Sequence, residues 1–321
     1  MGRCLKSIFA SGAEKNANVE VIVVNDGTPD NSMTIVDDFA SKHSNLFIIN
    51  QENAGLGEAR NAGLRIARGK YVWFVDSDDY VSQTAVSDLV QLAEQSNIEV
   101  YVFDTWRGYE NGSHMTSRRP LFIFKSNERC YGQIHDGYFY YKKIGCGTVW
   151  DKLFLRSFLL ENDLFFIPGI LHEDIEYVTR IFVCAKRVLP LKAMYYYYVV
   201  RISGSITTTF NIKRFDDQLY TIKLCVQRGN ESDNWRIRAL YNDAACRRSY
   251  RMLHPREAIR TEHAEFLSKH KAELRRIIIR SYFHSIRIND WRKTSYMLLT
   301  FLGISDGIDK VWCFLKDRIQ K

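Results

Sequence analysis

The sequence predicts an α/β protein with a doubly wound, mostly parallel sheet, followed by a helical C-terminal region. Hydrophobic runs alternate with helical patterns over the first 105 residues, and the loops between them are short, which is typical of parallel strands joined by helices. The runs are hydrophobic throughout rather than at every second position, as expected for strands buried on both faces. Helical patterns dominate after residue 210, so we expect that part of the chain to be mainly helical.

Strands and helices are expected in strict alternation along the first 105 residues. β-Branched and aromatic residues run together in the segments that we predict to be strands. These are 19–24, 46–50, 71–75 and 98–103. Apolar residues recur at helical spacing in the segments between them, which we predict to be helices. These are 32–40, 56–67 and 84–95.

The composition is that of an ordinary globular protein. Of the 321 residues, 46% are hydrophobic and 26% are charged, and no apolar run reaches the roughly 18 residues that span a bilayer. The seven cysteines are odd in number and irregularly spaced, which favours a reducing compartment over a disulfide framework. We therefore expect neither a membrane-spanning protein nor a disulfide-stabilised secreted domain.

Positive charge is concentrated in the last third of the chain. Residues 1–210 hold 22 Lys and Arg against 24 Asp and Glu, whereas residues 211–321 hold 23 against 13. A basic excess of this kind suits binding to nucleic acid, contact with an anionic membrane surface, or simple solubility. The charge alone leaves these three interpretations open.

Three carboxylates are crowded directly after the predicted strand 71–75. Asp76, Asp78 and Asp79 occupy three of four successive positions, where each raises the cost of ionising its neighbours. Ligands of open α/β sheets bind outside the carboxyl ends of the strands, and a divalent cation held there would relieve the repulsion. The alternative is that these residues only cap the helix that begins near Thr84.

Four segments in a fixed order resemble the family 2 glycosyltransferases with the GT-A fold. The resemblance covers about residues 3–205 and rests on the segments VIVVNDGTPDNS, NAGLGEARNAGL, GKYVWFVDSDD and HEDIEYV. It implies transfer of a sugar, with inversion, from a nucleotide-diphosphate sugar, a UDP-sugar being favoured. The implied acceptor is a glycan or a lipid-linked glycan in surface polysaccharide synthesis.

The resemblance also assigns roles on the donor side. Asp26 matches the acidic residue that contacts the nucleotide base, and Asn25 stands where many members carry another Asp. Arg60 matches a basic residue near the nucleotide. Asp78 would bind Mn²⁺ or Mg²⁺, and Asp76 would contact the ribose or the metal.

The catalytic base implied by the resemblance lies in the segment HED. Asp174 matches that base, with Glu173 beside it. His172, Lys152 and Arg201 are further candidates for contacts from loops near the site. A structural or solvated lysine is the alternative for Lys152, and ordinary loop polarity is the alternative for Arg201.

Three regions are expected: residues 1–105 would bind the nucleotide sugar, residues 106–210 the acceptor, and residues 211–321 would form the basic helical region. We expect a cytoplasmic protein, with peripheral contact to the inner face of the membrane through 211–321 and without a nucleic-acid partner. The first residues, GRCLKSIF, match the helix that follows the first strand of the family. The sequence therefore predicts that this strand is missing.

Two alternatives to a working glycosyltransferase follow from the residues. A nucleotidyltransferase can share a related α/β architecture, but it usually carries a Gly-rich basic loop after its first strand, and that part of the fold is not in the sequence. A transferase without its first strand could also be inactive and act only in binding. The placement of HED favours glycosyl transfer over nucleotidyl transfer, while the inactive transferase stays open.

Overall fold

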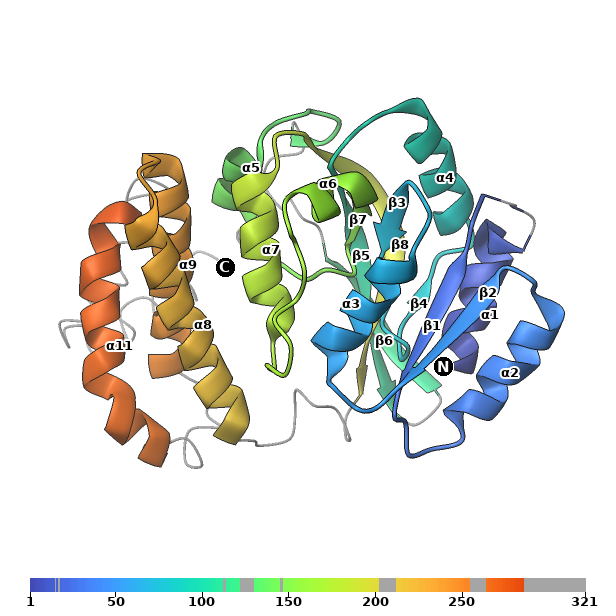
Figure 1. Cartoon of the computed structure of the whole chain (residues 1–321), viewed down its shortest axis with the longest axis horizontal. Helices are drawn as coiled ribbons and strands as arrows, with labels where there is room; N and C mark the ends of the chain where they lie inside the picture. Colours follow the sequence, from blue (N-terminus) through green and yellow to red (C-terminus); the bar gives the residue numbers. More distant parts are fainter. Residues whose placement is uncertain are drawn as a thin grey trace, which may run out of the picture. The chain divides into compact units, whose positions relative to one another are not determined.

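The protein is described here by a computed structural model (Figure 1). The structure describes residues 1–14, 16, 18–111, 114–121, 130–144, 147–201, 212–254 and 264–285. The chain divides into two compact units, Met1–Thr209 and Phe210–Lys321. All predicted site residues belong to the first unit.

The first unit has an α/β architecture, which confirms the predicted fold class. Its described strands are β1 (Val21–Asp26), β2 (Leu46–Gln51), β3 (Tyr71–Trp73), β4 (Tyr80–Val81), β5 (Val100–Asn111), β6 (His114–Leu121), β7 (Lys152–Leu155) and β8 (Val188–Arg201). Strands β1 and β2 pair with each other in a two-stranded parallel sheet. The other six form a second sheet in the order β3-β7-β5-β8-β4, with β6 paired to β5.

The strand directions in the larger sheet are mixed. Strands β5 and β8 pair in parallel, whereas β3 and β5 both run antiparallel to β7. Strand β6 begins three residues after β5 ends, and so short a connection can only join antiparallel strands, because a parallel pair needs a crossover of a dozen residues or more. The long β5–β6 pairing falls in the part of the sequence where the regular alternation ends.

The helices of the first unit confirm the three predicted from hydrophobic spacing. They are α1 (Gly2–Ile8), its continuation η1 (Phe9–Ala13), α2 (Ser32–Lys42), α3 (Leu56–Ile66), α4 (Ala85–Gln95), α5 (Gly137–Ile144), α6 (Arg156–Glu161) and α7 (Glu173–Cys184). Helices α2, α3 and α4 begin or end within two residues of their predicted bounds. The predicted helical character of the first residues is confirmed by α1.

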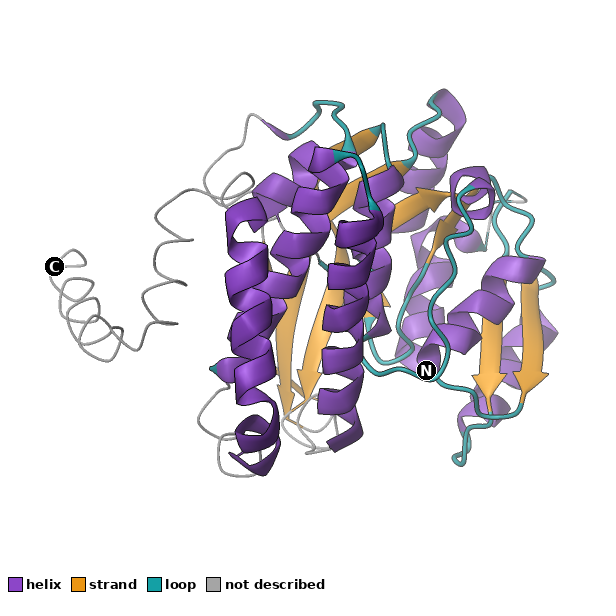
Figure 2. Cartoon of the chain, turned by 60° about the vertical axis from the view of Figure 1, so that its left-hand side comes forward, coloured by secondary structure: helices purple, strands orange, loops and turns teal. Residues whose placement is uncertain are grey.

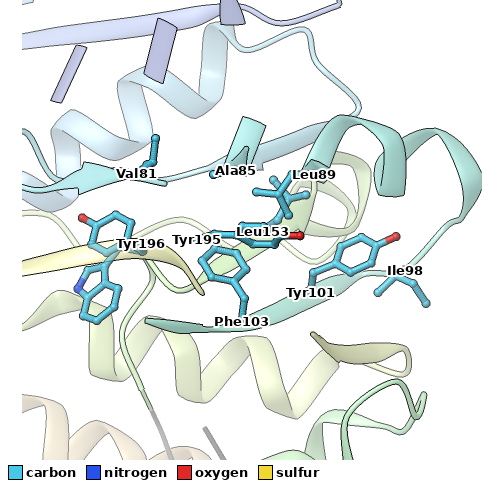
Figure 3. Close-up of a cluster of buried hydrophobic side chains, with 10 residues drawn as sticks. Val81, Ala85, Leu89, Ile98, Tyr101, Phe103, Leu153, Tyr195 and Tyr196 are labelled. Carbon is cyan, nitrogen blue, oxygen red and sulfur yellow. The ribbon is translucent and has the colours of Figure 1, made fainter. Parts of the chain in front are cut away.

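A core of aromatic and aliphatic side chains holds α4 against β5 and β8 (Figure 3). Phe103 and Tyr196 are completely buried in this core, and Tyr101 is 1% exposed. The ring of Trp150 stacks on Tyr196 with a centroid distance of 4.8 Å. Burying one large apolar side chain contributes about 1.5–3 kcal/mol to stability. This core therefore fixes β3 and β4, the strands before and after the acidic residues.

A second core joins α1 to the smaller sheet. Leu5 and Phe9 on the N-terminal helices pack with Val21 and Val23 of β1 and with Val36 of α2. Trp73 of β3 contacts the same cluster. The N-terminal helix is therefore part of the framework around the ends of β1 and β3, where the candidate site residues lie.

The second unit is helical over its described residues, as the sequence predicts. Helix α9 (Trp235–Leu253) packs against α8 (Ile212–Glu231) and α11 (Ala264–Ser285); these three helices are labelled in Figure 1, and Figure 2 draws all helices in purple. Small buried residues such as Ala244 and Ala245 allow close approach along α9. The remaining residues of the predicted membrane-contact segment, 286–321, lie outside the described part. No described helix is long and apolar enough to cross a membrane.

Candidate functional site

The acidic residues after β3 form a tight turn that separates their carboxylates. The backbone N–H of Asp79 donates to the carbonyl of Asp76 at 3.1 Å and closes the turn. Asp79 points inward and is 1% exposed, whereas Asp78 is exposed and Asp76 partly so. Burial raises the pKa of Asp79 to about 8. The fold therefore relieves the crowding by sending one carboxyl group into the core and leaving two near the surface.

Arg60 of α3 joins this acidic turn to the start of α7. Its Nη2 lies 2.8 Å from Asp76 Oδ1, and its Nη1 lies 2.5 Å from Glu173 Oε1. The Arg60 side chain is only 9% exposed. Burial by itself would lower the pKa of Arg60, but the carboxylates of Asp76 and Glu173 outweigh it and raise the pKa. A buried charge needs such partners, so the three side chains hold two distant segments of the chain together.

The first turn of α7 presents the residues of the segment HED. Glu173 is 6% exposed and paired with Arg60, while Asp174 keeps part of its surface exposed. The positive end of the helix dipole favours acidic side chains at this position. Burial, and next the nearby Glu173 carboxylate, raise the pKa of Asp174 from the ordinary value of 3.8 to about 7, against the lowering effect of Arg60. Asp174 is therefore suited to accept a proton near neutral pH.

Asn25 and Asp26 lie at the end of β1 and brace the loops around them. Asp26 accepts hydrogen bonds from Gln51 Nε2 at 2.7 Å, from Ala54 N at 2.8 Å and from Gly55 N at 2.9 Å. Asn25 accepts a hydrogen bond from the N–H of Thr28 and donates one to the side chain of Asn50. The contacts described here do not join these two residues to the Arg60 cluster, and their predicted contacts with a nucleotide stay predictions.

The three predicted loop residues have different environments. Lys152 is completely buried and donates to the carbonyl of Thr148 and to Asp151, both at 2.6 Å, which supports its structural alternative. His172 directly precedes α7 in a left-handed conformation, with φ 62° and ψ 38°, and such strained positions occur often at functional sites. Arg201 ends β8, where its backbone pairs with Glu110; its side chain lies outside the described part.

Two residues that the sequence reasoning missed hold the acidic turn. Tyr196 of β8 is hydrogen-bonded to both Asp76 and Asp79. Arg3 of α1 donates to the carbonyl of Asp78 at 3.1 Å and forms an ion pair with Glu110. The run of four tyrosines predicts only a buried strand, although alternation would have shown that every second ring shares a face. No sequence signal identifies Arg3.

The acidic turn offers a donor set that fits a hard divalent cation shared with a substrate. No group of three or more His, Cys, Asp or Glu side chains suited to a metal occurs in the part of the chain that the structure describes. Mg²⁺, however, is commonly held by one or two carboxylates together with phosphate oxygens of the substrate. The carboxylates of Asp76 and Asp78, both near the surface on one turn, fit such a site.

The sequence of the first half matches a known protein family. The profile of the family described as "Glycosyl transferase family 2" matches residues 1–156. Through these residues, the first half of the chain is similar to glycosyl transferase family 2. The matched glycosyltransferase region contains Asp26, Arg60 and the acidic turn, and Asp174 lies beyond it.

Curated proteins similar to this chain are named as glycosyltransferases. The uncharacterized glycosyltransferase YibD of Escherichia coli is 30% identical over 208 residues, which are 64% of this chain and 60% of YibD. The uncharacterized glycosyltransferase EpsJ of Bacillus subtilis is 45% identical over 84 residues, 26% of this chain and 24% of EpsJ. The poly(ribitol-phosphate) beta-glucosyltransferase of Bacillus spizizenii is 28% identical over 64% of this chain and 31% of its own length. The chain thus spans 24% to 60% of the length of these three relatives.

A solved structure has the same fold as this chain. Residues 1–349 of TarS from S. aureus, in complex with UDP-GlcNAc, match with a TM-score of 0.63 at 18% identity. The match covers 94% of this chain and 84% of that structure. The GT-A fold that the sequence motifs imply is thereby confirmed.

Proposed function

We propose that this protein transfers a sugar from a nucleotide-diphosphate sugar, a UDP-sugar being favoured, to a glycan or lipid-linked acceptor during surface polysaccharide synthesis. The observation that carries the proposal is the buried Arg60, which holds the acidic turn beside the first turn of α7. This arrangement brings candidate donor and base residues together. The UDP-GlcNAc complex of TarS and the polymer named in the Bacillus spizizenii relative support the donor and acceptor classes.

The reaction would be a single displacement at the anomeric carbon. Asp174 would accept the proton of the acceptor hydroxyl as its oxygen bonds to that carbon. The bond from the carbon to the diphosphate oxygen would break, and the nucleoside diphosphate would leave with the electron pair. One displacement inverts the anomeric centre, as in other inverting reactions with one carboxylate base. Glu173 is paired with Arg60, which leaves Asp174 as the better base.

A divalent cation completes the donor side of the proposal. Asp78, assisted by Asp76, would hold Mn²⁺ or Mg²⁺ together with the diphosphate. The ion would supply positive charge where the leaving diphosphate becomes more negative. Asn25 and Asp26 would contact the nucleotide from the end of β1. Asp26 Oδ2 accepts one hydrogen bond among the described contacts, from Gly55, and so has a lone pair to offer a nucleotide base.

The direct test is release of nucleoside diphosphate. We expect the full chain, incubated with Mn²⁺ and a panel of nucleotide sugars, to release UDP from at least one UDP-sugar faster when an acceptor glycan is present. Residual hydrolysis without acceptor is the background control. If no nucleotide sugar of the panel binds or turns over, the proposed function is wrong.

The pH dependence of turnover should follow the ionisation of the Asp174 carboxyl group. Because the base must be deprotonated and its pKa is raised to about 7, kcat should increase as pH rises through about 7 and fall by about tenfold per pH unit well below it. The effect on folding has the opposite sign: a carboxyl group with a raised pKa contributes stability below its ordinary pKa, and loses it as pH rises through about 7. Measuring kcat from acidic to mildly alkaline pH checks the predicted rise in turnover. A rate that is flat from acidic to neutral pH would contradict the assignment.

The basic helical region would place the enzyme at the inner face of the membrane. Each Lys or Arg near an anionic surface contributes about 1 kcal/mol to binding. We expect the full chain to float with anionic vesicles and not with zwitterionic ones, and to be released at high salt. Deleting residues 286–321, which mix apolar and basic side chains, should reduce flotation. Equal flotation with both kinds of vesicle, or no change on deletion, would contradict the membrane contact.

A further inference from the structure

We propose that Tyr196 and Asp79 are positioning residues of the donor site, which fix the backbone of the acidic turn so that Asp76 and Asp78 face the donor. The inference rests on the proposed function. Neither residue would touch the donor. They would act through the turn, and the structure supplies both the contacts and a way to separate this role from a purely structural one.

The hydroxyl group of Tyr196 bridges the two ends of the turn. Its oxygen accepts a hydrogen bond from the backbone N–H of Asp76 at 3.1 Å, and its proton is donated to Asp79 Oδ2 at 2.7 Å. The other carboxyl oxygen of Asp79 accepts from the backbone N–H of Val199 at 2.7 Å. These three hydrogen bonds form a closed path from β8 to the turn and back to β8. Both side chains are buried, so water cannot replace the partners cheaply.

Helix α1 holds the same turn from another side. Arg3 donates to the carbonyl of Asp78 at 3.1 Å, and the thiol of Cys4 donates to the carbonyl of Asp76 at 3.6 Å. The hydroxyl of Ser7 accepts from the N–H of Val81, just beyond the turn, at 3.0 Å. Side chains from two separate elements thus satisfy the backbone of a turn that carries exposed carboxylates. Supporting contacts of this kind fix the orientation of residues that bind ligands.

The contribution of Tyr196 to the fold can be separated from its contribution to the turn. Its ring stacks on Trp150 and lies in the aromatic core, and that packing does not need the hydroxyl. The described hydrogen bonds of the hydroxyl go only to Asp76 and Asp79. Tyr196→Phe therefore removes the bridge and keeps the ring.

The neighbouring Tyr195 provides a matched control. It lies on the same strand, is 8% exposed, and packs its ring at an edge-on angle against Phe103. Burial, and next the nearby Asp88 carboxylate, raise the pKa of Tyr195, and none of the described hydrogen bonds of the acidic turn comes from its hydroxyl. Tyr195→Phe therefore removes an equivalent oxygen from the same core without touching the turn.

The experiment compares UDP binding in the presence of Mn²⁺, measured by calorimetric titration, with steady-state kinetics on the full chain. We expect Tyr196→Phe to weaken UDP binding and raise the donor KM by roughly tenfold, because a backbone N–H loses its partner. The acceptor KM and the melting temperature should stay close to wild type. Tyr195→Phe should match wild type in its affinity for UDP and in its donor KM. Asp79→Asn keeps an acceptor oxygen for Val199 and should weaken UDP binding less, in the same direction.

The possible results are distinguishable. If Tyr196→Phe binds UDP as tightly as wild type, or if Tyr195→Phe weakens binding equally, the positioning role is wrong. A loss of stability alone would lower the yield of active enzyme but leave the dissociation constant for UDP unchanged, and that too would overturn it. If Tyr196→Phe does not fold, the affinity for UDP and the donor KM of Asp79→Asn decide whether the positioning role is right. If the wild-type chain binds no UDP, the proposed function fails, and this inference with it.

Discussion

Asp174→Asn should lower kcat by about 10²–10⁴-fold, the usual contribution of a general base, while donor affinity stays near wild type. Asparagine has nearly the same size as aspartate but cannot accept the acceptor proton. The residues that would bind the donor lie on other elements, at the ends of β1 and β3 and on α3. The measurement is donor affinity by titration together with turnover on the true acceptor, so that a binding defect and a chemical defect are read separately.

Glu173→Gln is the matched comparison for this prediction. Glu173 is adjacent and equally acidic, but its carboxylate is paired with Arg60. The glutamine side chain keeps the shape and weakens that ion pair, so we expect it to affect stability and donor affinity more than the proton transfer. If Asp174→Asn kept normal turnover while Glu173→Gln lost it, Glu173 would be the base. If both kept it, the proposed mechanism would be wrong.

Asp78→Ala should weaken donor binding and lower turnover together. Removing a carboxylate that would hold the cation leaves the charge of the diphosphate without a partner, and losses of roughly 10²–10³-fold in kcat are typical when a single stabilising group is removed. Turnover of the wild-type chain should stop in excess EDTA and return with Mn²⁺ or Mg²⁺. The calorimetric affinity for UDP should fall in the same variant, which distinguishes it from Asp174→Asn.

Ser77→Ala provides the control for the acidic turn. Ser77 is exposed and lies between Asp76 and Asp78, so its replacement tests whether any change in the turn disturbs the donor site. We expect binding and turnover near wild type. Undiminished turnover of the wild-type enzyme in excess EDTA would contradict the metal-dependent part of the proposal, whatever the outcome for Asp78→Ala.

The alternation of strands and helices could be predicted because it depends on local hydrophobic spacing. Helix α3 is predicted at 56–67 and found at Leu56–Ile66, since its apolar residues and its flanking turn formers are all near in sequence. The mixed strand directions could not be predicted in the same way. They depend on which strands become neighbours, and β3 pairs with β7, some 80 residues later.

The candidate site shows the same division between local and long-range information. The motifs locate Asp76, Asp78 and Asp174, because short segments carry them. The sequence does not show that Asp79 turns inward while Asp78 stays exposed, since three identical carboxylates differ only in their tertiary surroundings. Nor does it show that Arg60 is paired with residues 16 and 113 positions away, because such contacts exist only after folding.

The separate pairing of β1 with β2 has a consequence for the native-state dynamics of the protein. Among the described strands these two pair only with each other, whereas the acidic turn borders the six-stranded sheet. Small sheets are weakly stable by themselves, and parts of one protein open with different free energies. Backbone amides of β1 and β2 should therefore exchange with deuterium sooner than those of β5 and β8. The side of the donor site that would hold the nucleotide base then opens at a lower free energy than the side formed by the six-stranded sheet. Donor binding would slow the amide exchange of β1 and β2 most.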